Sequence, residues 1–149
     1  MPVHDLNREF LKTFKIDKFF KPEKRGGQKA VHFVEIKGKR YAMKLLLATS
    51  GIDERTKREL NIYEKFKGLE GIPTIFNIEM YEGELVVFEE YIEGDTLSDI
   101  VTSYANDHTK VTSLIKSVCD IMQPVWDARL IHRDIKPANV LITESGEPM

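Results

Sequence analysis

The segment HRDIKPANV, residues His132–Val140, places a carboxylate, an ammonium group and an amide close together. Asp134, Lys136 and Asn139 lie on a proline-containing stretch between a helical pattern and the short apolar run VLIT, so we expect a loop. In such a loop the carboxylate can orient a hydroxyl nucleophile, the ammonium can hold the γ-phosphate and the amide oxygen can ligate Mg²⁺. The segment therefore indicates phosphoryl transfer, with Asp134 and Lys136 as candidate catalytic residues and Asn139 as the candidate metal ligand.

This segment resembles the catalytic loop of the eukaryotic-like protein kinases, which reads H-R-D-x-x-x-x-N. The pair Lys136-Pro137 after the aspartate is similar to the Ser/Thr branch of that family rather than to the Tyr branch. The resemblance implies ATP and Mg as cofactors and a protein hydroxyl as the acceptor. Small-molecule kinases of the aminoglycoside phosphotransferase type share the Asp and the Asn but usually lack the Arg and the Lys-Pro pair, and they are an alternative.

Glycine turns divide the rest of the chain into regular segments. Strand-like alternation on both sides of Lys37-Gly38-Lys39 predicts a tight hairpin, and a second hairpin is expected at Glu82-Gly83. Between them, a helical pattern starts near Ser50 and ends at Gly68 or Gly71. Further helices follow residue 95. The N-terminal segment has apolar residues four apart, which predict a short amphipathic helix: Leu6, Phe10 and Phe14.

With the resemblance, this order implies an α+β, protein-kinase-like fold. It has an antiparallel five-stranded small lobe with one inserted helix, followed by a truncated helical large lobe. We expect an N-terminal helical extension over residues 1–15, the small lobe with glycine loop and hinge over residues 16–92, and a partial large lobe with the catalytic loop over residues 93–149.

Composition sets the broad class. The chain of 149 residues is 42% hydrophobic and 31% charged, as in a single globular domain. Residues 1–44 carry a charge of +7 and residues 45–149 a charge of −9, so the first third could steer phosphates or an acidic partner, or simply be solvated.

A pI of about 6.1 argues against a nucleic-acid-binding protein, and no apolar run is long enough for a membrane span or a signal peptide. We therefore expect a cytoplasmic protein, with the single Cys119 a buried, inert thiol.

The resemblance also assigns a nucleotide site to the first part of the chain. YAMK matches V-A-I-K, so Lys44 would hold the α- and β-phosphates. Its carboxylate partner is expected on the following helix, where Glu59 and Glu64 compete. Glu59 shares a helical face with Ile62 and Phe66, whereas Glu64 lies about 140° away, so Glu59 is the predicted partner.

The glycine loop and the hinge are predicted by register. KRGGQKAV stands where the family has G-x-G-x-x-G-x-V; setting Val31 on the motif's Val leaves a motif glycine only at Gly26, with Lys29 in place of the third. Backbone N–H groups of residues Gly26, Gly27, Gln28 and Lys29 would cover the phosphates. Glu89 would be the gatekeeper, a polar residue there that needs a partner, unless a one-residue slip places Phe88 there. The hinge would be Glu90, Tyr91 and Ile92, and the adenine would be sandwiched by Val31, Ala42 and Leu141.

The family's Asp-Phe-Gly would fall a few residues beyond Met149, which makes the catalytic set of these residues incomplete and implies weak or no activity for this chain alone. Three interpretations follow: a truncated kinase, half of a split kinase completed by a large-lobe partner chain, or a non-catalytic, pseudokinase-like regulatory module. We also expect an unpaired edge on strand Val140–Thr143 and an exposed apolar helical stripe, which favour such a partner or a homodimer. The stripe consists of Leu114, Val118, Ile121 and Val125.

Overall fold

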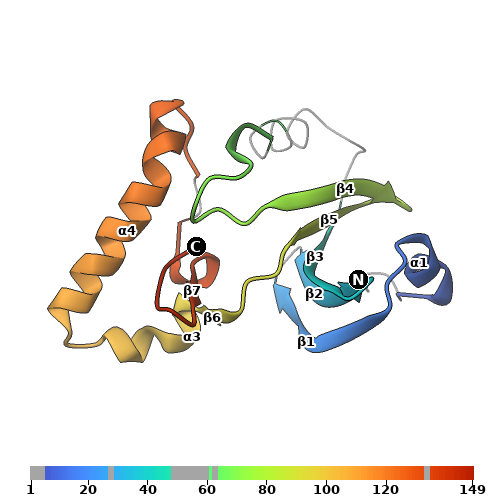
Figure 1. Cartoon of the computed structure of the whole chain (residues 1–149), viewed down its shortest axis with the longest axis horizontal. Coiled ribbons are helices and arrows are strands. Elements are labelled where there is room, and N and C mark those ends of the chain that lie inside the picture. The colour runs from blue at the N-terminus through green and yellow to red at the C-terminus, as the bar shows by residue number, and fades with distance from the viewer. Residues whose placement is uncertain (1–5, 27–28, 48–60, 62–63, 133–134) are drawn as a thin grey trace. The chain divides into compact units, whose positions relative to one another are not determined.

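The computed structural model describes residues 6–26, 29–47, 61, 64–132 and 135–149. The chain divides into two compact units (Figure 1). The first consists of Met1–Lys67 and Thr74–Tyr91, and the second of Gly68–Pro73 and Ile92–Met149. Within the described ranges, no helix has the length and apolar character needed to cross a membrane.

The first unit is built on a five-stranded sheet in which every pair of neighbours is antiparallel. The strand order is β1-β2-β3-β5-β4, so β3 and β5 are interior strands. Of the helix expected between β3 and β4, Asn61 and residues 64–66 are helical in the part that is described. This architecture confirms the predicted small lobe. The strands are β1 (Lys18–Gly26), β2 (Lys29–Ile36), β3 (Lys39–Leu47), β4 (Ile75–Tyr81) and β5 (Glu84–Glu90).

Both hairpins form at the predicted glycines. Lys37 and Gly38 connect β2 to β3 with φ angles of 49° and 75°, and Glu82 and Gly83 connect β4 to β5 with φ angles of 48° and 84°. Positive φ at both central residues defines a type I′ turn, whose twist matches that of the flanking strands. The second position of each turn is the glycine, which adopts this conformation at little cost.

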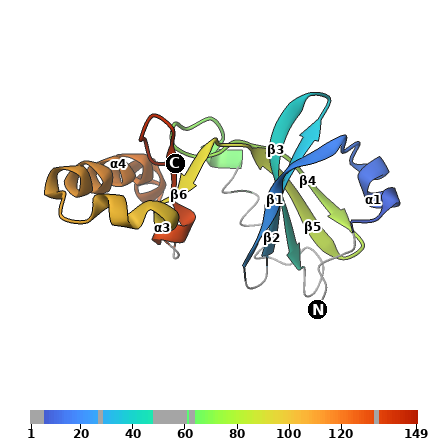
Figure 2. The ribbon, with the colours of Figure 1, turned by 90° about the horizontal axis from the view of Figure 1, so that it is seen from below.

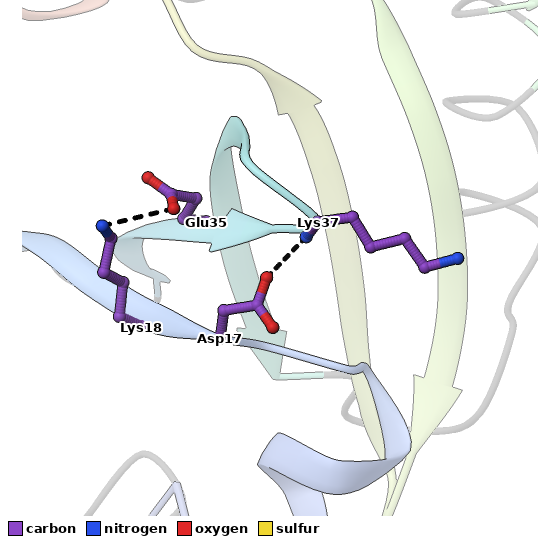
Figure 3. Close-up of polar contacts among 4 residues, drawn as sticks. All are labelled: Asp17, Lys18, Glu35 and Lys37. Atoms are coloured by element: carbon purple, nitrogen blue, oxygen red, sulfur yellow. Dashed lines mark hydrogen bonds and ion pairs between the residues drawn. The ribbon is translucent and has the colours of Figure 1, made fainter.

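Asp17 fastens the β2–β3 turn to the start of β1, as Figure 3 shows. Its carboxylate Oδ2 accepts a hydrogen bond from the Lys37 backbone N–H at 2.5 Å. Its own backbone N–H donates to the Glu35 carbonyl at 2.9 Å, and the Lys18 ammonium pairs with the Glu35 carboxylate at 3.2 Å. These contacts hold β1 against β2 at the end where their pairing is regular, before the register shifts further along β1.

The N-terminal helix α1 (Arg8–Thr13) has well-defined ends. The Asn7 side chain caps it by accepting from the Phe10 N–H at 2.9 Å, which satisfies one of the free N–H groups of the first turn. At the other end Lys15 has a φ of 55°, and the Ile16 N–H donates to the Leu11 carbonyl at 2.9 Å. This is the Schellman pattern that terminates a helix and turns the chain, here towards β1.

The helix packs on one face of the sheet (Figure 2). Phe10 is 1% exposed, and its ring lies 4.6 Å from that of Phe14 and 5.0 Å from that of Tyr81. Because side chains alternate along a strand, the face that α1 covers is opposite to the face that carries Lys44. Thus α1 completes the core of the first unit. The core cluster consists of Phe10, Phe14, Val34, Met43, Leu45, Val86 and Phe88.

The second unit is mainly helical, with one small two-stranded sheet. Strands β6 and β7 pair antiparallel, and the N–H of Leu97 donates to the carbonyl of Val140 at 2.8 Å. The long helix α4 begins after Asp107, whose carboxylate accepts from the Lys110 N–H at 2.9 Å. The elements are β6 (Gly94–Thr96), α3 (Leu97–Ile100), the 3-10 helix η1 (Val101–Tyr104), α4 (His108–Asp127), the 3-10 helix η2 (Pro137–Asn139) and β7 (Leu141–Thr143).

The expectation of an unpaired edge on the last strand is wrong. On one side β7 pairs with β6. On the other side the chain turns back, and Leu141 and Met149 exchange two backbone hydrogen bonds of 2.9 and 2.8 Å, while the Thr143 N–H donates to Glu147 at 2.9 Å. Both edges of β7 are therefore occupied by residues of the chain itself.

The apolar stripe of α4 also differs from the prediction. Val125 is 7% exposed, and the other three members are half-buried. Ile121 lies against Gly71, where an added Cβ would come within 2.5 Å of the isoleucine Cγ1. None of the four is fully exposed, and Ile121 packs against a residue of the second unit. Cys119 lies off this stripe and is exposed, which corrects the expectation of a buried thiol.

Candidate active site

An ion pair between Lys44 and Glu89 is the central feature of the first unit. Lys44 lies opposite Val87 in the ladder between β3 and β5, and Glu89 lies opposite Ala42, two residues along on the same face. The Lys44 Nζ contacts the Glu89 Oε2. Glu89 is only 7% exposed, whereas the lysine side chain is 29% exposed. The pair therefore combines a buried anion with a cation that reaches the surface.

The predicted partner Glu59 lies outside the described residues, so the described partner of Lys44 is on a strand and not on a helix. Sequence reasoning recognised that a glutamate at position 89 needs a partner but did not identify it. The signal was available in principle, because positions 44 and 89 share a face once β3 and β5 are paired. That pairing is a non-local property.

The neighbouring strand positions place further candidate residues on this face. Val31 lies directly opposite Lys44 in the ladder between β2 and β3, and Ala42 lies opposite Glu89. Phe88 instead belongs to the core cluster on the face covered by α1, where its ring is 5.5 Å from that of Phe14. In this register Glu89, and not Phe88, lies beside the lysine.

The expected glycine loop coincides with the connection between β1 and β2. Gly26 and Lys29 form the last residue pair of that ladder, and Gly27 and Gln28 between them lie outside the described residues. Lys29 is thus the first residue of β2, at the end of the hairpin, and its role in a glycine loop stays a prediction.

Backbone and ring contacts hold the end of β5 and the residue that follows it. The Glu90 N–H donates to the Thr74 carbonyl at 2.7 Å, and the Glu90 carboxylate accepts from the Thr74 N–H at 3.2 Å. The Tyr91 ring packs edge-on against Phe20 and Phe33 at 4.9 and 5.8 Å. Glu90 and Tyr91 are therefore fastened to the first unit, and the boundary with the second unit falls before Ile92.

In the second unit the HRDIKPANV segment is held at both ends. Helix α4 ends in a Schellman motif, in which Arg129 has a φ of 57° and the Leu130 N–H donates to the Val125 carbonyl at 3.1 Å. Of the candidate residues, Asp134 lies outside the described part, whereas Lys136 and Asn139 are exposed at the two ends of η2, with a 2.8 Å bond from the Asn139 N–H to the Lys136 carbonyl. This backbone bond closes one turn of 3-10 helix between the two residues.

Gly94 supports this loop and was missed by sequence reasoning. A Cβ at this position would lie 2.1 Å from the carbonyl oxygen of Ile142, so only glycine permits the close approach of β6 and β7. Because Leu141 follows directly after the loop, the pairing of these two strands fixes where the loop ends. The glycine in EGDTL was the available signal, but its partner strand was not apparent.

The donors of the segment suit a hard cation. The Asn139 amide oxygen belongs to the ligand type that Mg²⁺ accepts, with phosphate oxygens as co-ligands. Among the residues that the structure describes, no group of three or more His, Cys, Asp or Glu could hold a metal ion, so a self-contained protein cage is absent from that part.

A small antiparallel sheet with a strand lysine bound to a buried carboxylate, in a chain that also carries an H-R-D-x-x-x-x-N loop after a helix, is typical of a protein kinase domain. The protein kinase domain model matches residues 27–149, and the chain therefore belongs to the protein kinase domain family. The resemblance to Ser/Thr protein kinases is thereby confirmed.

Curated relatives agree with this family. The chain is 30% identical over 101 residues to the serine/threonine-protein kinase PknA of Nostoc sp., covering 66% of this chain and 18% of that protein. It is 34% identical over 71 residues to PknF of Mycobacterium tuberculosis, covering 46% and 15%. It is 28% identical over 93 residues to mitogen-activated protein kinase kinase kinase 4 of Mus musculus, covering 62% and 6%. The chain thus spans less than a fifth of the length of these relatives.

Proposed function

We propose that the chain supplies the nucleotide lobe and the catalytic loop of a Ser/Thr protein kinase, which transfers the γ-phosphate of ATP to hydroxyl groups of proteins. The observation that supports this most directly is the Lys44–Glu89 pair on an interior strand. A buried carboxylate holds the ammonium in one place, so the lysine offers a fixed positive charge for phosphate oxygens.

Each nucleotide contact has a residue assigned to it in this proposal. Lys44 binds the α- and β-phosphates, and the N–H groups of the β1–β2 connection cover the phosphates. In the first unit Val31 and Ala42 present apolar surface beside the lysine for the adenine ring. The remaining assignments follow the resemblance: Glu90 and Ile92 for backbone bonds to adenine, Leu141 for packing on the ring, and Glu59 as a further carboxylate for the lysine.

The loop residues carry the transfer itself. Asp134 orients the acceptor hydroxyl, whose oxygen forms the new bond to the γ-phosphorus while the bond to the β–γ bridging oxygen breaks, and the hydroxyl proton passes to the carboxylate. Lys136 neutralises charge on the γ-phosphate. Asn139 would help to hold Mg²⁺, which, when bound, offsets the negative charge of the phosphates. The products are a phosphoester and ADP.

Nucleotide binding tests the first half of this proposal. Calorimetry with ATP and Mg²⁺ should show that Lys44→Gln weakens binding by about tenfold to a hundredfold, because a hydrogen bond from a charged group contributes roughly 1.5–3 kcal/mol. The matched control is Lys39→Gln, which removes an exposed lysine from the same strand and should leave affinity unchanged. Equal affinity for all three proteins would remove Lys44 from the site.

Phosphate transfer tests the second half. Incubated with labelled ATP, the chain together with a large-lobe partner should phosphorylate a serine-containing peptide and not its tyrosine counterpart. Asp134→Asn should abolish this transfer while ATP affinity stays the same, because the carboxylate acts on the acceptor and not on the nucleotide. An Asp134→Asn protein with full activity would show that another group orients the hydroxyl.

A further inference from the structure

Glu89 is held more rigidly than a residue at the edge of a sheet would be. Its strand β5 lies between β3 and β4, and Glu89 pairs with Ala42 on one side and Ile75 on the other. The ladder between β3 and β5 runs without a register shift from Tyr41–Glu90 to Leu47–Glu84. The backbone that carries the carboxylate is therefore held by regular pairing with β3, and on its other side it pairs with Ile75 next to a register shift in β4.

The two members of the ion pair are buried to different degrees, and this difference matters for ligand binding. The Glu89 side chain is 9% exposed and its carboxylate contacts Lys44, whereas the lysine side chain is 29% exposed. An ammonium group has three N–H donors, so one bond to the carboxylate leaves others for a second anion. The exposed side of the lysine can therefore bind phosphate oxygens while Glu89 remains in contact.

The origin of the carboxylate distinguishes this arrangement from the one predicted from sequence. A carboxylate delivered by a separate helix holds the lysine only when that helix is in the right place. A carboxylate on β5 belongs to the same sheet as the lysine, two ladder positions away, and needs no movement of another element.

We propose that Glu89 is the positioning residue for Lys44, so that the sheet itself sets the lysine for the nucleotide phosphates. The inference rests on the proposed role of Lys44 in phosphate binding. If Glu89 acts only through the Lys44 ammonium, its substitution should affect the affinity for ligands that carry phosphates. It should not affect binding of the adenine base.

The test compares ATP with adenosine, which lacks phosphates. Glu89→Gln keeps the shape of the side chain and removes its charge. The protein should still fold, because the partner left behind is the more exposed lysine, which water can solvate. We expect ATP affinity in calorimetry to fall about tenfold, the loss of roughly 1.4 kcal/mol expected for a weakened charged contact, and adenosine affinity to change less than about twofold. Glu79→Gln is the control: it changes an exposed glutamate of strand β4 and should leave ATP affinity unchanged.

A double variant shows whether Glu89 acts through Lys44. In the Lys44→Gln background, Glu89→Gln should cause no further loss of ATP affinity, because the group that it positions is already gone. Unchanged or tighter ATP binding by Glu89→Gln alone would overturn the inference, and tighter binding would show that the carboxylate competes with phosphates. A loss with Lys44→Gln but not with Glu89→Gln would leave the proposed function standing. An unaffected Lys44→Gln protein would instead contradict the proposed function.

Discussion

Phe10→Ala should lower the stability of the first unit strongly, although residue 10 lies far in sequence from every candidate site residue. The phenyl ring is 1% exposed and contacts Phe14 and Tyr81 at ring-centroid distances of 4.6 and 5.0 Å. Truncation of a buried phenylalanine to alanine costs about 3–5 kcal/mol, through lost burial and the cavity that remains. With an m value of about 2 kcal/mol/M, the urea midpoint should fall by roughly 1.5–2.5 M.

The assay must report on the sheet. The single tryptophan, Trp126, lies in the second unit, so its fluorescence reports on that unit, and far-ultraviolet circular dichroism is the better probe of the first. Lys12→Ala is the matched control: it changes an exposed residue of the same helix and should shift the midpoint little. Phe10→Leu keeps most of the apolar volume and should fall between the two, which also gives a measurable value where the alanine variant is unfolded.

Equal urea midpoints for Phe10→Ala and Lys12→Ala would contradict this prediction. That result would mean that α1 does not contribute to the core of the sheet and is only an appended segment. A graded series, with alanine below leucine and leucine below phenylalanine, would confirm that α1 stabilises the face of the sheet opposite Lys44.

Three further predictions concern single contacts. Gly94→Ala should lower the free energy of unfolding by about 3 kcal/mol, because the new Cβ would lie 2.1 Å from the Ile142 carbonyl oxygen and must separate β6 from β7. A lower urea midpoint, measured by Trp126 fluorescence, checks this prediction. Gly71→Ala should lower the free energy of unfolding by about 2 kcal/mol, because Gly71 has a φ of 81° and an added Cβ would overlap Ile121 of α4. An unchanged midpoint in the same measurement would contradict this. Asp17→Ala should cost about 1 kcal/mol by removing the acceptor that holds the β2–β3 turn, seen by circular dichroism, with no change expected in ATP affinity.

Local chemistry determined which features the sequence could predict. A type I′ turn requires positive φ at two successive positions, so Gly38 and Gly83 mark their hairpins without any knowledge of the rest of the chain. The HRDIKPANV and YAMK motifs are equally local, since each places its chemical groups within a few residues. Their order along the chain was sufficient to predict the kinase family and the five-stranded sheet, both of which are confirmed.

The tertiary structure decided which residues meet across strands and helices. The partner of Lys44 in the described part is Glu89, 45 positions later in the chain, and it becomes a neighbour only because β3 and β5 pair in one particular register. The neighbours of β7 are also distant in sequence or brought back by a turn: β6 pairs with one edge and Glu147–Met149 with the other. Likewise, Ile121 of α4 packs against Gly71, which precedes the helix by many residues. Helical and strand periodicities specify which face of an element is apolar, but not what packs against that face, because packing depends on the positions of segments that are distant in sequence.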